Sequence, residues 1–164
     1  MDRVRLDSSS VTRAIEAVQL RLPESTVCLV CTALETSRGV VLLGPSSATR
    51  RLAQALGDEA QHAGYAAGLY RLSEADTVEI AVGRLQLGEW LFLEELSAPV
   101  IEALLSSLAG MLDLRAELPT ARALIESPTW RLLLAFEPRC DQRMPPIRVD
   151  RRRHFPMVEV QETG

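Results

Sequence analysis

Three glutamates stand at the ends of short apolar runs, where carboxylates could carry acid–base or metal chemistry. Glu94 and Glu95 follow the run WLFL at 90–93, and Glu137 follows WRLLLAF at 130–136. Apolar runs of this kind are typical of strands that a parallel sheet buries on both faces. Ligands of open parallel sheets bind outside the carboxyl ends of the strands. Clustered carboxylates at that edge could exchange protons with a substrate or hold a divalent cation.

A second group of residues lies in the turn GPSSATRR at 44–51, directly after the apolar run VVLL. A phosphate-binding loop in this position reads G-x-x-x-x-G-K-[ST], because glycines let backbone N–H groups wrap the phosphates, lysine bridges the outer phosphates and the hydroxyl binds magnesium. Here Gly44 and Pro45 open the turn. Thr49 stands in place of the second glycine, Arg50 in place of the lysine and Arg51 in place of the hydroxyl.

These replacements remove the parts that phosphoryl transfer needs. The chain has 18 basic residues, all of them arginine, so no lysine elsewhere can substitute. The planar fork of an arginine is no simple replacement for a compact ammonium, and a β-branched threonine does not easily adopt the conformations of glycine. Because such catalysis depends on positioning and charge stabilisation, we expect no catalytic residues and no ATP turnover.

The elements that position these residues alternate between strand and helix. Strand–helix alternation predicts a parallel sheet with helices on both faces, here a three-layer α/β fold with five strands. We expect a single domain over 1–164, with N-terminal helices at 1–38, an α/β core at 39–161 and a tail at 162–164. The predicted strands are 40–43, 66–71, 90–93, 130–136 and 157–160. The first predicted helix is 8–22, with an N-cap in Ser8–Ser10, and a second is opened by Pro23 and ended by Gly39. Further helices are predicted at 48–62, from Ser73, after the N-cap Ser97, and at 146–153. Residues 113–129 are predicted to be a variable connection.

The order of these segments resembles the α/β subdomain of AAA+ ATPases, especially the dynein heavy-chain and midasin-like modules. The resemblance rests on Gly44-Pro45 after VVLL, GEWLFLEEL at 88–96, WRLLLAFEP at 130–138 and MPPIRVDRRRHFPMVEV at 144–160. It implies a P-loop-type sheet over residues 20–160. It also implies that Glu94 and Glu95 match the acidic pair of the third strand, and that Glu137 replaces the sensor asparagine of the fourth.

The departures from this family all weaken nucleotide chemistry. A carboxylate at Glu137 puts negative charge where the γ-phosphate of ATP belongs. The sequence stops after the fifth predicted strand, so we expect no helical lid. Arg152 or Arg153 could match the family's arginine finger, which acts on a neighbouring subunit, but the other elements of that site are replaced.

The resemblance and its departures leave three hypotheses open. The first is a pseudo-ATPase that serves as a protein-interaction or structural module within a larger complex, in a cytoplasmic, dynein-like or ciliary assembly. The second is a domain that binds ATP or ADP through Arg50 or Arg51 at a helix N-terminus without hydrolysing it. The third is an enzyme of another kind that uses the carboxylates of Glu94, Glu95 and Glu137.

Charge and hydropathy argue against two classes of partner. The net charge of −4 argues against a general nucleic-acid binder. The one basic cluster consists of Arg148, Arg151, Arg152 and Arg153, which we interpret as a solvated face or a contact with a protein partner. No apolar run approaches the ~18 residues of a membrane span, and MDRVRLDSSS does not resemble a secretory signal.

The remaining motif is the C-x-x-C pair Cys28 and Cys31, with a third cysteine at Cys140. The pair lies in an apolar helical stretch without Gly or Pro to form a ligand loop, so we expect buried thiols and no metal site. Trp90 and Trp130 begin two of the predicted strands, and we expect both in the core.

Overall fold

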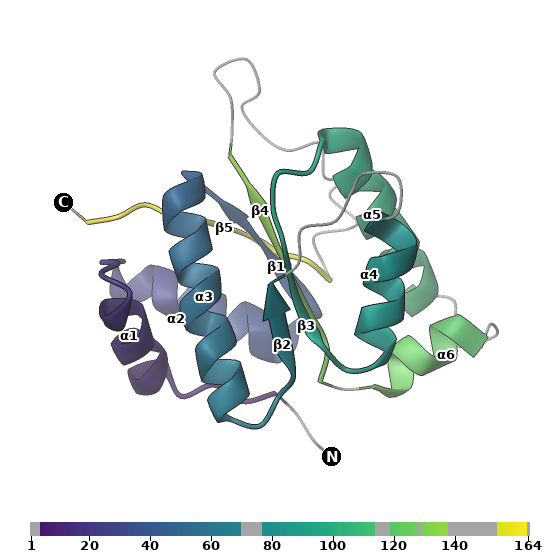
Figure 1. The fold of residues 1–164 in the computed structure, drawn as a ribbon, viewed down its shortest axis with the longest axis horizontal. Coiled ribbons are helices and arrows are strands. Elements are labelled where there is room, and N and C mark those ends of the chain that lie inside the picture. The colour runs from purple at the N-terminus through teal and green to yellow at the C-terminus, as the bar shows by residue number, and fades with distance from the viewer. Residues whose placement is uncertain (1–3, 70–76, 114–118, 128, 138–153, 164) are drawn as a thin grey trace.

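Five parallel strands form the centre of the computed structural model, which describes residues 4–69, 77–113, 119–127, 129–137 and 154–163 (Figure 1). The order across the sheet is β2-β3-β4-β1-β5, and every neighbouring pair is parallel. The predicted α/β class with a parallel sheet is therefore confirmed. The strands are β1 (Gly39–Leu43), β2 (Ala67–Leu69), β3 (Trp90–Leu93), β4 (Arg131–Phe136) and β5 (Met157–Glu159).

The helices that the structure describes cover both faces of this sheet, with three in each layer (Figure 1). One layer consists of the two N-terminal helices and the helix that follows β1. The other layer consists of the helix that follows β2 and the two helices that follow β3. Because the N-terminal helices share a hydrophobic cluster with the sheet, they belong to the same packed unit as the strands. The first layer is α1 (Ser8–Ala17), α2 (Glu24–Thr36) and α3 (Ser46–His62), and the second is α4 (Thr77–Gln86), α5 (Ala98–Asp113) and α6 (Pro119–Glu126).

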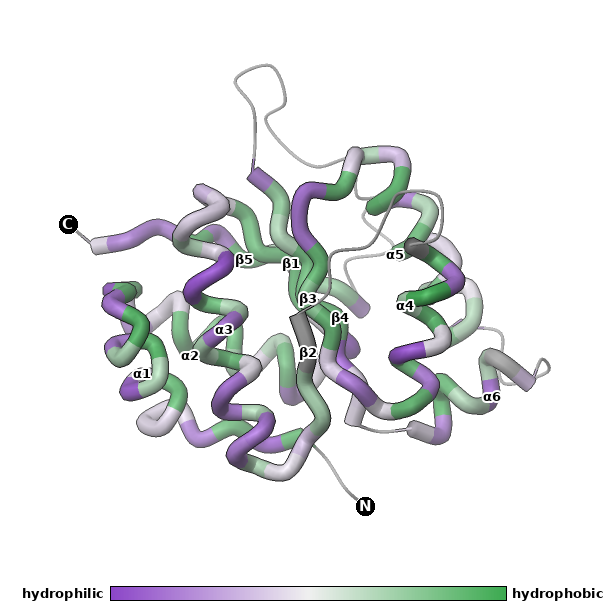
Figure 2. Tube along the Cα trace, in the orientation of Figure 1, coloured by the Kyte–Doolittle hydropathy of each residue, from purple (hydrophilic) through white to green (hydrophobic). Residues whose placement is uncertain are grey.

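The apolar strands divide their side chains between the two layers, as the pleat of a strand requires. In β4, Leu133 and Ala135 join the cluster under α1–α3, whereas Leu132 and Leu134 join the cluster under α4–α6. The strands accordingly form the apolar centre of the fold in Figure 2. The prediction that both tryptophans are core residues is confirmed, since neither is more than 1% exposed.

The start and end of the first helix differ from the prediction. Asp7, not the serine run, is the N-cap, and its Oδ1 accepts a hydrogen bond of 3.2 Å from the N–H of Ser9. The helix ends at Ala17 because the chain turns at Gln19, which has a φ of 60°. The second helix begins at Glu24, with Pro23 as its N-cap residue.

The variable connection predicted for 113–129 contains a helix, α6, which the prediction missed. Its last turn is held from outside: the indole Nε1 of Trp130 donates a 2.7 Å hydrogen bond to the carbonyl of Leu124. Tertiary contact of this kind stabilises a helix of 8 residues, a length that is marginal in isolation. The Arg-rich helix predicted at 146–153 lies outside the described residues. Among the helices that the structure does describe, none is long and apolar enough to cross a membrane.

Candidate functional site at the carboxyl edge of the sheet

The predicted site residues that follow β1, β3 and β4 lie at one edge of the sheet. These strands are neighbours in parallel register, with Leu43 beside Phe136 and Leu93 beside Leu134. Their carboxyl ends therefore lie at the same edge, and the segments after them meet there. We call the group formed by Arg50, Glu94, Glu95 and Glu137 the carboxyl-edge cluster.

The turn after β1 does not form a phosphate-wrapping loop. Helix α3 begins at Ser46, two residues after Gly44, so most of the segment that a phosphate loop would use is already helical. Thr49 is completely buried in the first turn, and its Oγ1 donates to backbone carbonyls of that turn, with Pro45 at 3.3 Å and Ser46 at 3.2 Å. A buried threonine in helical conformation cannot take the place of the second glycine.

Gly44 itself has a packing reason to be glycine. A Cβ built at this position would lie 2.5 Å from the carbonyl oxygen of Val160. The two segments are bonded around this point, because the N–H of Val160 donates to the carbonyl of Leu43 at 2.7 Å. The glycine of the turn therefore permits the close approach of the chain after β5, and its presence is no evidence of phosphate binding.

Arg50 points from the first turns of α3 to the two glutamates after β3. Its Nε donates to Oε2 of Glu94 at 3.1 Å, and its NH2 lies 3.9 Å from Oε1 of Glu95. The Glu94 side chain is only 3% exposed, whereas that of Arg50 is 43% exposed. The hydrogen bond and the negative charge of Glu94 raise the pKa of Arg50 above its ordinary value. The guanidinium of Arg50 thus balances the negative charge of the buried Glu94 carboxylate.

Glu95 adopts a backbone conformation that is unusual for its type. Its φ is 60°, in the left-handed region that few non-glycine residues visit. This conformation turns the chain out of β3 toward α5 and leaves the Glu95 side chain 64% exposed. Strained residues of this kind gather at functional sites, which makes the exposed carboxylate the part of the cluster best placed for contact with another molecule.

Glu137 supplies a carboxylate to the N-terminus of α3. Its Oε2 accepts a 3.4 Å hydrogen bond from the backbone N–H of Ser46. The N-cap residue, Pro45, makes no side-chain capping bond, so Glu137 acts where a capping side chain would normally act. A helix N-terminus favours negative charge, and here a strand-end glutamate of the same chain provides it.

Arg51, which the sequence places in the same degenerate motif, lies apart from the carboxyl-edge cluster. Its guanidinium donates to the carbonyl of Gln19 at 2.8 Å and pairs with Glu162. Arg51 therefore links α3 to the connection between α1 and α2 and to the tail after β5. The basic group Arg148, Arg151, Arg152 and Arg153 lies outside the described residues.

The cysteines differ from the prediction in one respect. Cys31 is buried as expected, but Cys28 is exposed, because it lies on the outer side of α2. Cys140 lies outside the described residues. In the part of the chain that the structure describes, no group of three or more His, Cys, Asp or Glu side chains could hold a metal ion.

Two arginines at the opposite, amino edge of the sheet went unrecognised in the sequence. Arg131 begins β4, is 4% exposed, and donates from Nε to the carbonyl of Leu34 in the last turn of α2. Arg38 lies 4.8 Å over the ring of Trp130 and donates to the carbonyls of Ile125 and Ser127, at the end of α6. The sequence did contain a signal of the buried arginine, because Arg131 is a charged residue at the start of an otherwise apolar strand.

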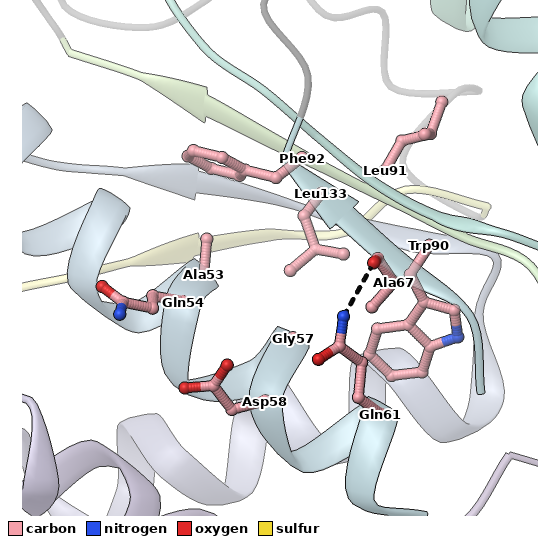
Figure 3. A pocket seen from close by; sticks show the side chains of 10 residues that line it. All are labelled: Ala53, Gln54, Gly57, Asp58, Gln61, Ala67, Trp90, Leu91, Phe92 and Leu133. Atoms are coloured by element: carbon pink, nitrogen blue, oxygen red, sulfur yellow. Dashed lines mark hydrogen bonds between the residues drawn. The ribbon is translucent and has the colours of Figure 1, made fainter. Parts of the chain in front are cut away.

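A small cavity of about 120 Å³ lies between α3 and the strands β2 and β3, apart from the carboxyl-edge cluster (Figure 3). Gln61 borders it and donates from Nε2 to the carbonyl of Ala67 at 3.0 Å. Its volume is well below the roughly 300–1,000 Å³ of small-molecule pockets, so it does not fit a nucleotide. A wider hollow of about 710 Å³ lies over the connection between α1 and α2. The small cavity is lined by Ala53, Gln54, Gly57, Asp58, Gln61, Ala67, Trp90, Leu91, Phe92 and Leu133.

Comparison with known proteins finds matches among solved structures. No family profile and no curated protein matches the chain. A solved structure described as a DNA replication initiation factor is similar to 93% of this chain at 16% identity, with a TM-score of 0.44. The chain spans 44% of that protein's length. A likeness at this level does not establish a shared function.

Proposed function

We propose that this chain is an AAA+-like α/β domain that does not hydrolyse nucleotide and acts as a protein-interaction module. The observation that carries the proposal is the self-contained charge pairing of the carboxyl-edge cluster. Arg50 is bonded to Glu94, and Glu137 is bonded to the N-terminus of α3. The polar groups that would meet phosphates in an ATPase are thus engaged by side chains of the chain itself.

The charge of the cluster opposes an anionic ligand. Three carboxylates and one guanidinium give a local net charge of 1 − 3 = −2. A triphosphate at the N-terminus of α3 would have to displace Glu137 and would face Glu94 and Glu95, with Arg50 as the one cation of the cluster. Clefts lined by one sign of charge attract the opposite sign. We therefore infer a partner that presents basic side chains to Glu95 and Glu137.

The finer identification, a dynein-like or ciliary assembly in the cytoplasm, rests on the sequence resemblance alone. Binding of ATP or ADP without hydrolysis is the second candidate. It is supported by the N-terminus of α3, where Pro45 makes no side-chain capping bond and a phosphate could replace the Glu137 carboxylate, because a helix N-terminus favours anions.

Thermal unfolding with millimolar Mg-ATP, Mg-ADP or neither tests the nucleotide part. A ligand at ~100 times its Kd adds about 2.7 kcal/mol of stability, which raises Tm by several degrees in a domain of this size. We expect no shift and no phosphate release. A shift that Arg50→Ala abolishes would instead establish the second candidate, and phosphate release that persists in a purified chain would overturn the proposal.

The partner inference has its own test. A short arginine-rich peptide should bind the chain with an affinity that falls as salt rises, and a neutral peptide of the same length should not. The double variant Glu95→Gln/Glu137→Gln should lose that binding. A matched control, Glu16→Gln/Glu24→Gln, removes the same charge from the exposed surface of α1 and α2. If both double variants weaken binding equally, attraction by overall net charge explains the result and the inferred surface is wrong.

A further inference from the structure

Two thiols lie one helical turn apart on α2, outside the carboxyl-edge cluster. Cys28 is exposed, and Cys31 is buried against the core at 6% exposure, in the same hydrophobic cluster as Val27 and Leu34. The pair therefore combines one thiol that solvent reaches with one thiol that solvent hardly reaches. Nothing in the proposed function uses either of them.

The spacing on the helix brings the two side chains within reach of each other. Residues three apart in an α-helix have Cα atoms about 5 Å apart, from the rise and radius of the helix, which lies within the roughly 4.4–6.8 Å that a disulfide spans. Burial raises the pKa of the Cys31 thiol to about 11, and the charge of Glu35 and then the neighbouring Cys28 and Asp7 contribute to the rise. The raised pKa leaves little Cys31 thiolate near neutral pH, so the exchange step that Cys31 carries out is the slower of the two.

We propose that Cys28 and Cys31 are a dithiol that a low-molecular-weight disulfide oxidises to an intrachain disulfide. The Cys28 thiolate attacks one sulfur of the small disulfide, a Cys28–S–S–R bond forms, and one RS⁻ leaves. The Cys31 thiolate then attacks Sγ of Cys28 and expels the second RS⁻. The two thiol protons pass to the two leaving thiolates, so the dithiol is oxidised by two electrons and the small disulfide is reduced.

The geometry also determines what kind of disulfide results. Cβ atoms at this helical spacing are about 5–6 Å apart, whereas a disulfide holds them at roughly 3.5–4.5 Å. One turn of α2 must therefore distort when the bond forms. Strained or exposed disulfides are the readily reduced, regulatory kind, so the oxidised form should revert with mild thiol reductants and should have a lower Tm than the reduced form.

The test uses the full chain with Cys140→Ser, so that the pair holds the only thiols. Glutathione disulfide is added at neutral to mildly alkaline pH, and the products are followed by intact mass and peptide mapping. We expect a transient glutathione adduct on Cys28, followed by loss of that adduct and of two hydrogens from the chain. Dithiothreitol should then restore the starting mass and the starting Tm.

Single variants in the same background separate the roles of the two thiols. Cys31→Ser should keep the adduct on Cys28 permanently, and Cys28→Ser should react more slowly than the chain with both thiols, because the remaining thiol is buried. Cys31→Ala is the second choice if the serine variant does not fold, as judged by a cooperative melt. An adduct on Cys28 that persists in the folded chain with both thiols, or equal reactivity of Cys28→Ser and that chain, would overturn the proposal.

Discussion

The substitution Gly44→Ala separates a packing role of this glycine from a phosphate-binding role. The added Cβ would lie 2.5 Å from the carbonyl oxygen of Val160, about 1 Å inside ordinary van der Waals contact. The obstacle is backbone, which cannot swing aside as a flexible side chain can. The segment after β5 must shift, and the hydrogen bond from Val160 to Leu43 is lost or stretched.

The magnitude follows from these two costs. Overpacking of a well-packed site costs roughly 1–3 kcal/mol, and a lost backbone hydrogen bond costs about 0.5–1.5 kcal/mol. We therefore expect Gly44→Ala to destabilise the fold by about 2–4 kcal/mol. A domain of this size loses roughly 2–4 °C of Tm per kcal/mol, so Tm should fall by about 4–16 °C.

Gly57 offers the matched control, because a Cβ there would meet nothing within 4 Å and the residue lies inside α3. Alanine is favoured over glycine inside a helix by about 0.5–1 kcal/mol, so Gly57→Ala should raise Tm by a few degrees. Circular dichroism melts and urea titrations of the two variants measure both effects. If Gly44→Ala melts within 2 °C of the parent, the close approach of Val160 does not constrain this position and the packing explanation fails.

Three further predictions concern individual side chains. Arg50→Met should lower Tm because it removes the guanidinium that pairs with the buried carboxylate of Glu94. Adding Glu94→Gln should recover part of the lost Tm. A double variant that melts below Arg50→Met would contradict this reasoning. Trp130→Phe should destabilise the fold by about 1–2 kcal/mol in urea titrations, since the Leu124 carbonyl loses its indole donor, and an unchanged midpoint would show that the bond contributes nothing. The folded-state pKa of Cys31 is raised from 9.0 to about 11, so this thiol contributes stability that is fully present below pH 9 and is lost as pH rises to 11. Two pKa units correspond to roughly 2.7 kcal/mol; allowing for partial solvent screening, we expect a loss of about 2 kcal/mol in the reduced chain that Cys31→Val does not show.

The alternation of strands and helices could be predicted from the sequence because the apolar pattern is local. Strands β1, β3 and β4 appear as short apolar runs, and helices α1–α5 show apolar residues at helical spacing. The order of the strand ends then places Glu94, Glu95 and Glu137 at one edge. These parts of the prediction need only parallel topology, which strand–helix alternation implies.

Contacts between distant segments could not be read from the sequence. The capping of α3 by Glu137 joins residues 91 positions apart, and the last turn of α6 is bonded to the indole of Trp130, just before β4. The buried position of Arg131 follows from the nearby carbonyl of Leu34, which only the folded chain brings close. The sequence pattern also places Arg50 and Arg51 in the same motif. Adjacent residues of a helix point about 100° apart, so Arg50 pairs with Glu94 whereas Arg51 pairs with Glu162.

The arginines of the amino edge have a consequence for how the fold comes apart. Arg131 reaches from β4 to the end of α2 in one layer, and Arg38, just before β1, reaches to the end of α6 in the other. Cations near helix C-termini are favourable, and detaching either layer would remove carbonyl partners from a charged side chain at the sheet. The two layers should therefore open together as one cooperative unit, and backbone amides in α2 and α6 should exchange their hydrogens with similar opening free energies.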